Sequence, residues 1–241
     1  MQLFERHYHI ITFPEISFSM KKFLTVIFGI AACACVLLSS LLTACKRQTD
    51  YFRYVSEYRK SVYFYSDDKL SVKIYSVDRE TPYSLDGIKG ETNALTEVYV
   101  QLAKTADEVE AELLGQGGEM SYLAVTRNYY LSFSGTEANG ASVDVKITVD
   151  GTATEIKALN VAEEGTIDGK SALKCVLDYD GGTFSALTDR GAFAGEIYIR
   201  LLYDEGCFYY VGVCDRDKNV HAYLVSGTDG RVIAEREMTA E

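Results

Sequence analysis

The chain contains no tryptophan, only two prolines and only three histidines among its 241 residues. Two of those histidines lie within the first nine residues, so His221 is the single histidine of the remaining chain. A catalytic triad or a Cys–His pair needs a histidine as its base, and no serine stands in a G-x-S-x-G sequence. A structural zinc site needs three or four Cys/His ligands at close spacing, which Cys207, Cys214 and His221 lack. The sequence therefore predicts no catalytic residues, no metal site and no cofactor, and a protein that is not an enzyme.

Basic residues are also in short supply. The chain has 24 Lys and Arg against 35 Asp and Glu, which gives a formal net charge of −11 at pH 7. Binding to nucleic acid depends on clustered Lys and Arg, so nucleic acid is excluded as a partner. Anionic lipid headgroups also repel an acidic surface. Attachment to a membrane would therefore require a covalent lipid or a membrane-spanning segment.

One long apolar run extends from Phe23 to Leu42 and follows the basic sequence Met20-Lys21-Lys22. A basic segment followed by an apolar segment is the layout of a secretory signal. The run ends in Leu42-Thr43-Ala44-Cys45, with small residues directly before the cysteine. This ending resembles the lipobox of bacterial lipoproteins. About 20 apolar residues can also span a bilayer, so an uncleaved helical anchor is the alternative.

The lipobox resemblance implies that signal peptidase II cuts between Ala44 and Cys45 and that the Cys45 thiol carries a diacylglycerol. It places the protein on the extracytoplasmic face of a bacterial, Gram-positive cell membrane, with the membrane as a partner through the lipid on Cys45. Residues 20–44 are then the signal peptide, and residues 1–19 are an extension upstream of the true start. Removing residues 1–44 takes away three basic and two acidic residues, which changes the net charge from −11 to −12.

Residues 45–60 are polar and aromatic and are predicted to be a tether, with one short helix. Over residues 61–159, short apolar alternations predict about eight strands in an antiparallel β-sandwich. Asp150-Gly151 predicts a two-residue hairpin that pairs Val145 with Ile156, whereas Gly115–Gly118 is predicted to be a turn. The sandwich is immunoglobulin-like only in architecture, because the Cys–Trp–Cys core is missing.

Residues 160–241 are predicted to form a small α+β unit, so that the whole fold is mainly β. Thr166 or Asp168 can cap a helix from Lys170 to Tyr179. A four-strand antiparallel meander follows over residues 196–203, 207–214, 220–225 and 231–236. The sequences Phe208–Val213 and Tyr223–Ile233 give residues 166–237 a resemblance to the PepSY domain of secreted bacterial proteins. That resemblance implies an envelope module, with inhibition of a peptidase proposed for some relatives.

Three smaller patterns concern chemistry. Asp215-x-Asp217-x-Asn219 begins like a calcium loop, but Val220 and Ser226 stand where such a loop needs glycine and glutamate, so a polar turn is expected. Cys207 and Cys214 share one predicted strand and would lie roughly 23 Å apart, too far to bond. A disulfide from Cys175 to either of them stays open.

The tyrosines near the start of the predicted domain could stack on a sugar or pack the sheets, and packing is the favoured hypothesis. Those considered are Tyr51, Tyr54, Tyr58, Tyr63 and Tyr65.

These patterns favour a non-enzymatic, lipid-anchored extracytoplasmic protein that binds another envelope component, either a protein or a cell-wall ligand. The first alternative is a hydrolase of cell-wall glycan or peptide that uses acidic residues, since glycosidases need only a pair of carboxylates. The second alternative is a structural spacer.

Replacing Cys45 with alanine is expected to abolish lipid attachment, because the thiol is the acylation point of this motif. Each buried CH₂ contributes about 0.8 kcal/mol to membrane retention, and a net charge of −12 offers no electrostatic substitute. Metabolic labelling with a tagged fatty acid measures the effect. Label that persists in Cys45→Ala would show that another residue carries the lipid. An unmutated protein without label would favour the helical anchor.

Overall fold

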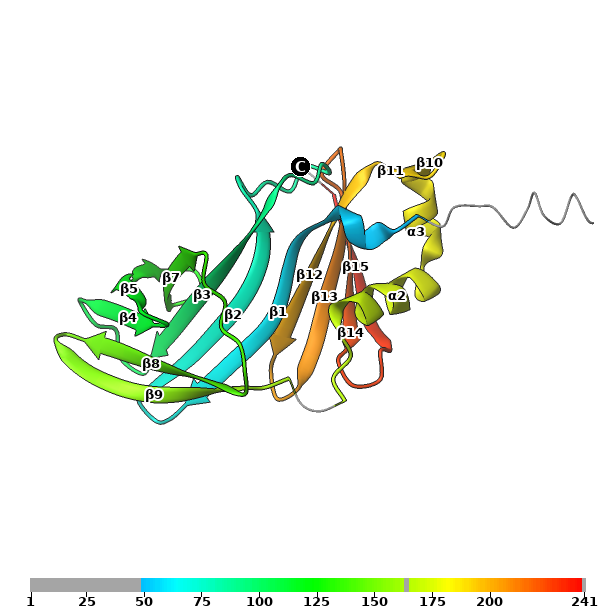
Figure 1. The fold of residues 1–241 in the computed structure, drawn as a ribbon. Helices are drawn as coiled ribbons and strands as arrows, with labels where there is room; N and C mark the ends of the chain where they lie inside the picture. The colour runs from blue at the N-terminus through cyan, green and yellow to red at the C-terminus, as the bar shows by residue number, and fades with distance from the viewer. Residues whose placement is uncertain (1–48, 163–164, 240–241) are drawn as a thin grey trace, which may run out of the picture. The chain divides into compact units, whose positions relative to one another are not determined.

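The computed structural model describes residues 49–162 and 165–239, which form one unit dominated by β-strands (Figure 1). The predicted signal peptide, the upstream extension, the Ala44–Cys45 cleavage site and the lipid on Cys45 lie outside the described residues. Within the described ranges, no helix has the length and apolar character needed to cross a membrane. The prediction of a mainly β fold is confirmed.

Thirteen strands belong to one sheet, whose main path runs β15-β14-β13-β12-β1-β2-β3-β7-β6. The strands of this path are β1 (Val55–Ser66), β2 (Leu70–Glu80), β3 (Thr92–Leu102), β6 (Ser121–Leu123), β7 (Asn128–Ser134), β12 (Gly195–Tyr203), β13 (Cys207–Asp215), β14 (Val220–Ser226) and β15 (Val232–Met238). The branch strands are β4 (Val109–Leu113), β5 (Gln116–Glu119), β8 (Ser142–Val149) and β9 (Thr152–Asn160). The remaining elements are η1 (Tyr51–Tyr54), α2 (Gly169–Tyr179), α3 (Gly181–Ala186), β10 (Thr188–Asp189) and β11 (Ala192–Phe193).

The branch strands form the second layer of the predicted sandwich. Tyr63 and Phe64 of β1 pair with Asn160 and Leu159 of β9, so the two layers are joined along one side. Alternation along the strands sends one set of side chains into the space between the layers. The buried set from the main path is Tyr63, Val72, Ile74, Val98 and Val100, and the set from the branch is Val109, Val143, Val145, Ile147 and Ile156. Each fully buried aliphatic side chain contributes roughly 1.5–3 kcal/mol relative to exposure.

The hairpin between β8 and β9 is formed as predicted. Asp150 and Gly151 have φ values of 47° and 77°, the left-handed conformation at both central positions that a type I′ turn requires. Val145 lies opposite Ile156. The turn predicted at Gly115–Gly118 is wrong in position. Leu114 and Gly115 make the turn with φ values of 54° and 76°, and the other glycines extend into β5.

The C-terminal part contains the predicted helix and four-strand meander. The Asp168 side chain accepts a hydrogen bond from the Ser171 N–H and so caps α2. Figure 1 shows α2 lying across β13 and β14. The helix contributes Ala172, Leu173 and Val176 to a core that also holds Ile197, Ile199, Leu201, Val211 and Tyr223.

Strand β1 differs from the prediction, because it begins at Val55 and not near Ser61. The tether predicted for residues 45–60 is therefore replaced over residues 51–60 by η1 and the first half of a central strand. Tyr51 of η1 packs edge-to-face against Phe184 and Phe193. Strand β1 also pairs in parallel with β12, with Val55 opposite Ile197. This parallel pairing joins the sandwich and the meander into one sheet.

Gly212 of β13 lies opposite Tyr198 of β12, and a Cβ at this position would overlap the tyrosine ring. We expect Gly212→Ala to lower the free energy of unfolding by about 1–3 kcal/mol, because the ring must leave its packed position. Denaturant titration measures the change. Gly118→Ala is the matched control, since an added Cβ there meets no atom within 4 Å. Equal effects of the two substitutions would contradict the packing argument.

Candidate binding face

The candidate site is the surface of β1, β2, β3, β7 and β12 on which Glu57, Arg79, Glu97 and Arg200 form one network of ion pairs. In β12, Ile197 and Ile199 pack in the core with α2, so Tyr198 and Arg200, which alternate with them, point to the opposite side. Glu57 of β1 pairs with Tyr198, which places both side chains on that same side. We call this surface the arginine–tyrosine face. Its members are Glu57, Arg59, Tyr75, Arg79, Tyr83, Glu97, Tyr99, Tyr130, Tyr198 and Arg200.

Two buried carboxylates hold the arginines in place. Glu57 is 0% exposed and accepts hydrogen bonds from Arg79 Nη2 at 3.1 Å and from Arg200 Nη2 at 2.7 Å. Glu97 accepts from Arg79 Nη1 at 2.7 Å and from the Tyr130 hydroxyl at 3.0 Å. The resulting chain of charges crosses four strands, from β3 through β2 and β1 to β12. Such a network fixes the guanidinium planes before any ligand arrives.

The pKa of Glu57 shows how strongly the arginines act on it. Burial by itself raises the pKa of this carboxyl, but the hydrogen bond from Arg200 and the charges of Arg200, Arg79 and Arg59 outweigh burial and hold the pKa at about 2. Glu57 is therefore ionised throughout the physiological pH range. Removing one partner of a buried ion pair typically costs 3–5 kcal/mol, because the other charge is left without compensation.

Arg59 is held more loosely than the other two arginines. Its Nη2 lies 3.6 Å from Glu97 Oε2 and 3.9 Å from Glu57 Oε1, and its guanidinium carbon lies 4.0 Å from the centre of the Tyr75 ring. The Nε atoms of Arg59, Arg79 and Arg200 are buried and have no acceptor among the described residues. Three guanidiniums and two carboxylates leave a local charge of +1 on a chain whose formal net charge is −11.

Tyrosines flank these charges. The rings of Tyr75 and Tyr99 meet edge-to-face at 5.7 Å between centroids, and Tyr99 lies 5.0 Å from Tyr130. Tyr99 and Tyr130 are half-buried, so part of each ring borders solvent. Burial, followed by the charge of Glu97, raises the pKa of Tyr99 well above its usual range. Its hydroxyl is therefore a hydrogen-bond donor at neutral pH.

The β2–β3 loop (residues 81–91) adds Tyr83 to the face, where the Tyr83 hydroxyl lies 2.8 Å from Arg200 Nη2. Two further buried carboxylates anchor this loop. Glu80 accepts from the N–H groups of Ser84 and Gly90, and Glu196 accepts from those of Asp86 and Gly87. Burial, together with the charge of Glu80, raises the pKa of Glu196 to about 7. Sequence alone gave no indication of this anchor.

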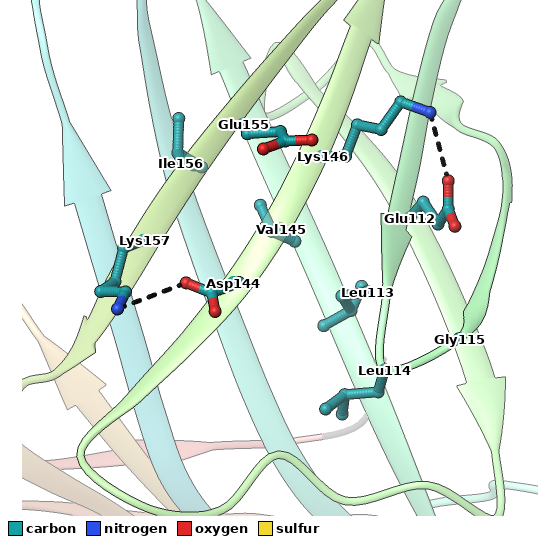
Figure 2. Close-up of a pocket in the computed structure, with 10 residues that line it drawn as sticks. All are labelled: Glu112, Leu113, Leu114, Gly115, Asp144, Val145, Lys146, Glu155, Ile156 and Lys157. Atoms are coloured by element: carbon teal, nitrogen blue, oxygen red, sulfur yellow. Dashed lines mark hydrogen bonds and ion pairs between the residues drawn. The ribbon is translucent and has the colours of Figure 1, made fainter.

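A groove of about 540 Å³ lies elsewhere, along β4, β8 and β9. Figure 2 shows four of its five charged residues in two pairs, with Lys146 pointing toward Glu112 and Lys157 toward Asp144. The four side chains are largely exposed and neutralise one another. Surface ion pairs of this kind contribute about 0–1 kcal/mol. Glu155 also lines the groove and is exposed. The groove is therefore a solvated outer face of the sandwich in which the charged side chains are exposed.

The residues singled out from sequence lie apart from the arginine–tyrosine face. The Asp215 carboxylate accepts from the N–H groups of Asp217 and Asn219, so it serves its own turn. His221 lies 3.6 Å from Glu237. Cys175 has a free thiol, so the disulfide left open above is not formed. Among the described residues, no group of three or more His, Cys, Asp and Glu side chains can hold a metal ion.

The tyrosines considered from sequence as a sugar-stacking surface serve mainly in packing. Tyr51, Tyr54 and Tyr58 pack against the helix-side core, Tyr63 is buried in the sandwich, and Tyr65 lies at the sandwich edge. The tyrosines of the face were missed, because they come from separate strands and a loop and only strand pairing brings them together. No protein-family model, curated protein or solved structure matches this chain.

Glu196→Gln should remove a pH dependence of stability. The folded-state pKa of about 7 exceeds the ordinary value of 4.5, so the folded protein binds more protons than the unfolded chain between these pH values. The free energy of unfolding therefore falls as pH rises from 4.5 to 7. Glutamine does not ionise and keeps an oxygen acceptor for the loop N–H groups. We expect the variant to be more stable than the unmutated protein at pH 8 by about 1–3 kcal/mol.

Denaturant titration at pH 4.5, 6 and 8 measures this difference. The exposed Glu155→Gln is the matched control and should leave the pH profile unchanged. A Glu196→Gln profile parallel to that of the unmutated protein would show that this carboxyl does not titrate as described.

Proposed function

We propose that this protein is a lipid-anchored extracytoplasmic protein of the bacterial cell envelope. It is not an enzyme, and it binds another envelope component, a protein or a cell-wall ligand, through the arginine–tyrosine face. One observation carries the proposal: the half-buried side chains of Arg59, Arg79, Arg200, Tyr99 and Tyr130 lie beside buried glutamates, at positions where packing alone would need only apolar side chains. The resemblance of Leu42-Thr43-Ala44-Cys45 to a lipobox and the resemblance of residues 166–237 to a PepSY domain support the location.

The composition of the face suits recognition. Arginine and tyrosine are over-represented among the residues that dominate binding energy at protein interfaces. Tyrosine offers a large contact area together with a hydroxyl, and arginine offers a rigid fork of donors. Tyr99 and Tyr130 come from β3 and β7, and Arg59 comes from β1. Side chains placed on strands keep a more constant geometry than side chains on loops.

Prior ordering of the face reduces the cost of binding. Each side chain immobilised at an interface costs about 0.5–1.5 kcal/mol. Arg79 and Arg200 are already fixed by Glu57, and Arg59 is already stacked on Tyr75. Little additional order is therefore needed when a ligand arrives.

The hydrolase alternative has one observation in its favour. Glu196, with its pKa of about 7, lies near Glu80, and glycosidases act through a pair of carboxylates. Both side chains are buried, however, and their oxygens accept the N–H groups of the 81–91 loop. A substrate would have to displace that loop to reach them. The binding proposal requires no such displacement.

Sedimentation with washed, delipidated envelope fragments tests the binding proposal. The mature chain with Cys45→Ser is expected to pellet with the fragments, and Tyr99→Ser should weaken this retention about tenfold or more, the size of a moderate interface hot spot. Tyr122→Ser is the matched control, because Tyr122 is exposed and lies on β6 outside the face.

Equal retention of the two tyrosine variants would exclude the face as the binding surface. If the Cys45→Ser chain with both tyrosines intact is not retained on the fragments either, the structural spacer becomes the better hypothesis. Turnover of cell-wall glycan or peptide that is lost in Glu196→Gln would favour the hydrolase instead.

A further inference from the structure

We propose that the arginine–tyrosine face recognises a carboxylate group and that Arg59 is the residue that receives it. The inference rests on the proposed function, because it names the chemical class of ligand for the same face. It is carried by an imbalance within the network: three guanidiniums share two carboxylates.

Three of the four oxygens of the two carboxylates accept hydrogen bonds from other donors, and the fourth, Glu97 Oε2, lies 3.6 Å from Arg59 Nη2 and accepts none. Glu57 is shared by Arg79 and Arg200, with one oxygen directed to each. Glu97 Oε1 accepts from Arg79 and from Tyr130. Charge-assisted N–H···O bonds are about 2.7–2.9 Å long, and the contacts of Arg59 at 3.6 and 3.9 Å exceed that range. Arg59 is the arginine of this network that lies near both carboxylates but donates a hydrogen bond to neither.

The donors of Arg59 are correspondingly underused. A guanidinium carries five N–H donors in a planar fork, and the Nε–H of Arg59 is buried without an acceptor among the described residues. The side chain is 11% exposed, and its guanidinium carbon lies over the Tyr75 ring, 4.0 Å from the ring centre. A small part of the side chain therefore borders solvent. A carboxylate meeting that part would supply two acceptors in the bidentate geometry that guanidinium favours.

The same geometry argues for a single negative charge on the ligand. The network has a net charge of +1, which one carboxylate neutralises. A phosphate dianion would carry a second charge without a partner, and the acidic remainder of the chain would repel a polyanion. Tyr99, beside Tyr75, offers a half-buried ring edge and a hydroxyl donor to the group that carries the carboxylate. The terminal carboxylate of a peptide and the carboxylate of a sugar acid both meet this description.

Binding is tested with the full chain in neutral detergent, labelled with ¹⁵N-arginine. The probes are N-acetylalanine for a peptide carboxylate and glucuronate for a sugar acid. N-acetylalanine amide and glucose are the uncharged controls. We expect at least one acid to shift the Nε–H signal of Arg59 in a saturable manner, while its uncharged control does not. Arg59→Gln should weaken binding about tenfold or more, the usual effect of losing a hydrogen bond to a charged group.

Arg59→Gln leaves two arginines and two glutamates in balance, so the variant is expected to fold, and its melting temperature is measured alongside. Arg59→Lys keeps the charge without the planar fork, and it should also bind more weakly if the fork matters. Arg53→Gln, an exposed arginine of η1, is the matched control. The proposal is overturned by undiminished binding in Arg59→Gln, by equal binding of the uncharged controls, or by tighter binding of inorganic phosphate.

Competition separates this inference from the proposed function. If saturating N-acetylalanine and glucuronate both leave the protein bound to envelope fragments, carboxylate recognition fails while envelope binding stands. If no envelope retention exists but an acid binds at Arg59, the proposed function fails while the site remains.

Discussion

The buried carboxylate of Glu57 is the interaction on which the arrangement of the sheet depends. It lies on β1, between β2 on one side and β12 on the other, and it binds an arginine from each. A buried ion pair adds little net stability compared with apolar packing, but leaving one charge uncompensated is very costly. Any register that separated Glu57 from Arg79 or Arg200 would incur that cost. The carboxylate therefore favours this one pairing of β1 with both neighbours.

Two buried glutamates on paired strands have opposite electrostatic surroundings. The arginines around Glu57 lower its pKa to about 2, whereas Glu196 is buried near Glu80 and has a pKa of about 7. Glu57 maintains the charged network under the arginine–tyrosine face, and Glu196 anchors the loop that carries Tyr83. The rigid and the pH-responsive parts of the surface thus meet at Arg200, which contacts both Glu57 and Tyr83.

Much of the fold could be predicted from local sequence signals, whereas the face could not. The Asp150-Gly151 hairpin and the α2 helix with its Asp168 cap depend on residues close together in the chain. The start of β1 was hidden, because Ser56 and Glu57 are polar but buried. Charged residues in a strand normally indicate a solvated side, so Arg79 and Glu97 gave no sign of a shared network. The network forms only when strands that are distant in sequence pair with each other, as Val55 of β1 does with Ile197 of β12.

The parallel pairing of β1 with β12 also has a consequence for how the chain acquires its structure. Residues 55–59 of β1 obtain their second neighbour only when residues 195–203 pair with them. Tyr63 and Phe64 of the same strand pair with β9 instead. Contacts between residues so distant in sequence slow folding, and unpaired strand edges promote aggregation in the interval. The first half of β1 is therefore completed late in folding, and its edge can pair with another chain until β12 occupies it.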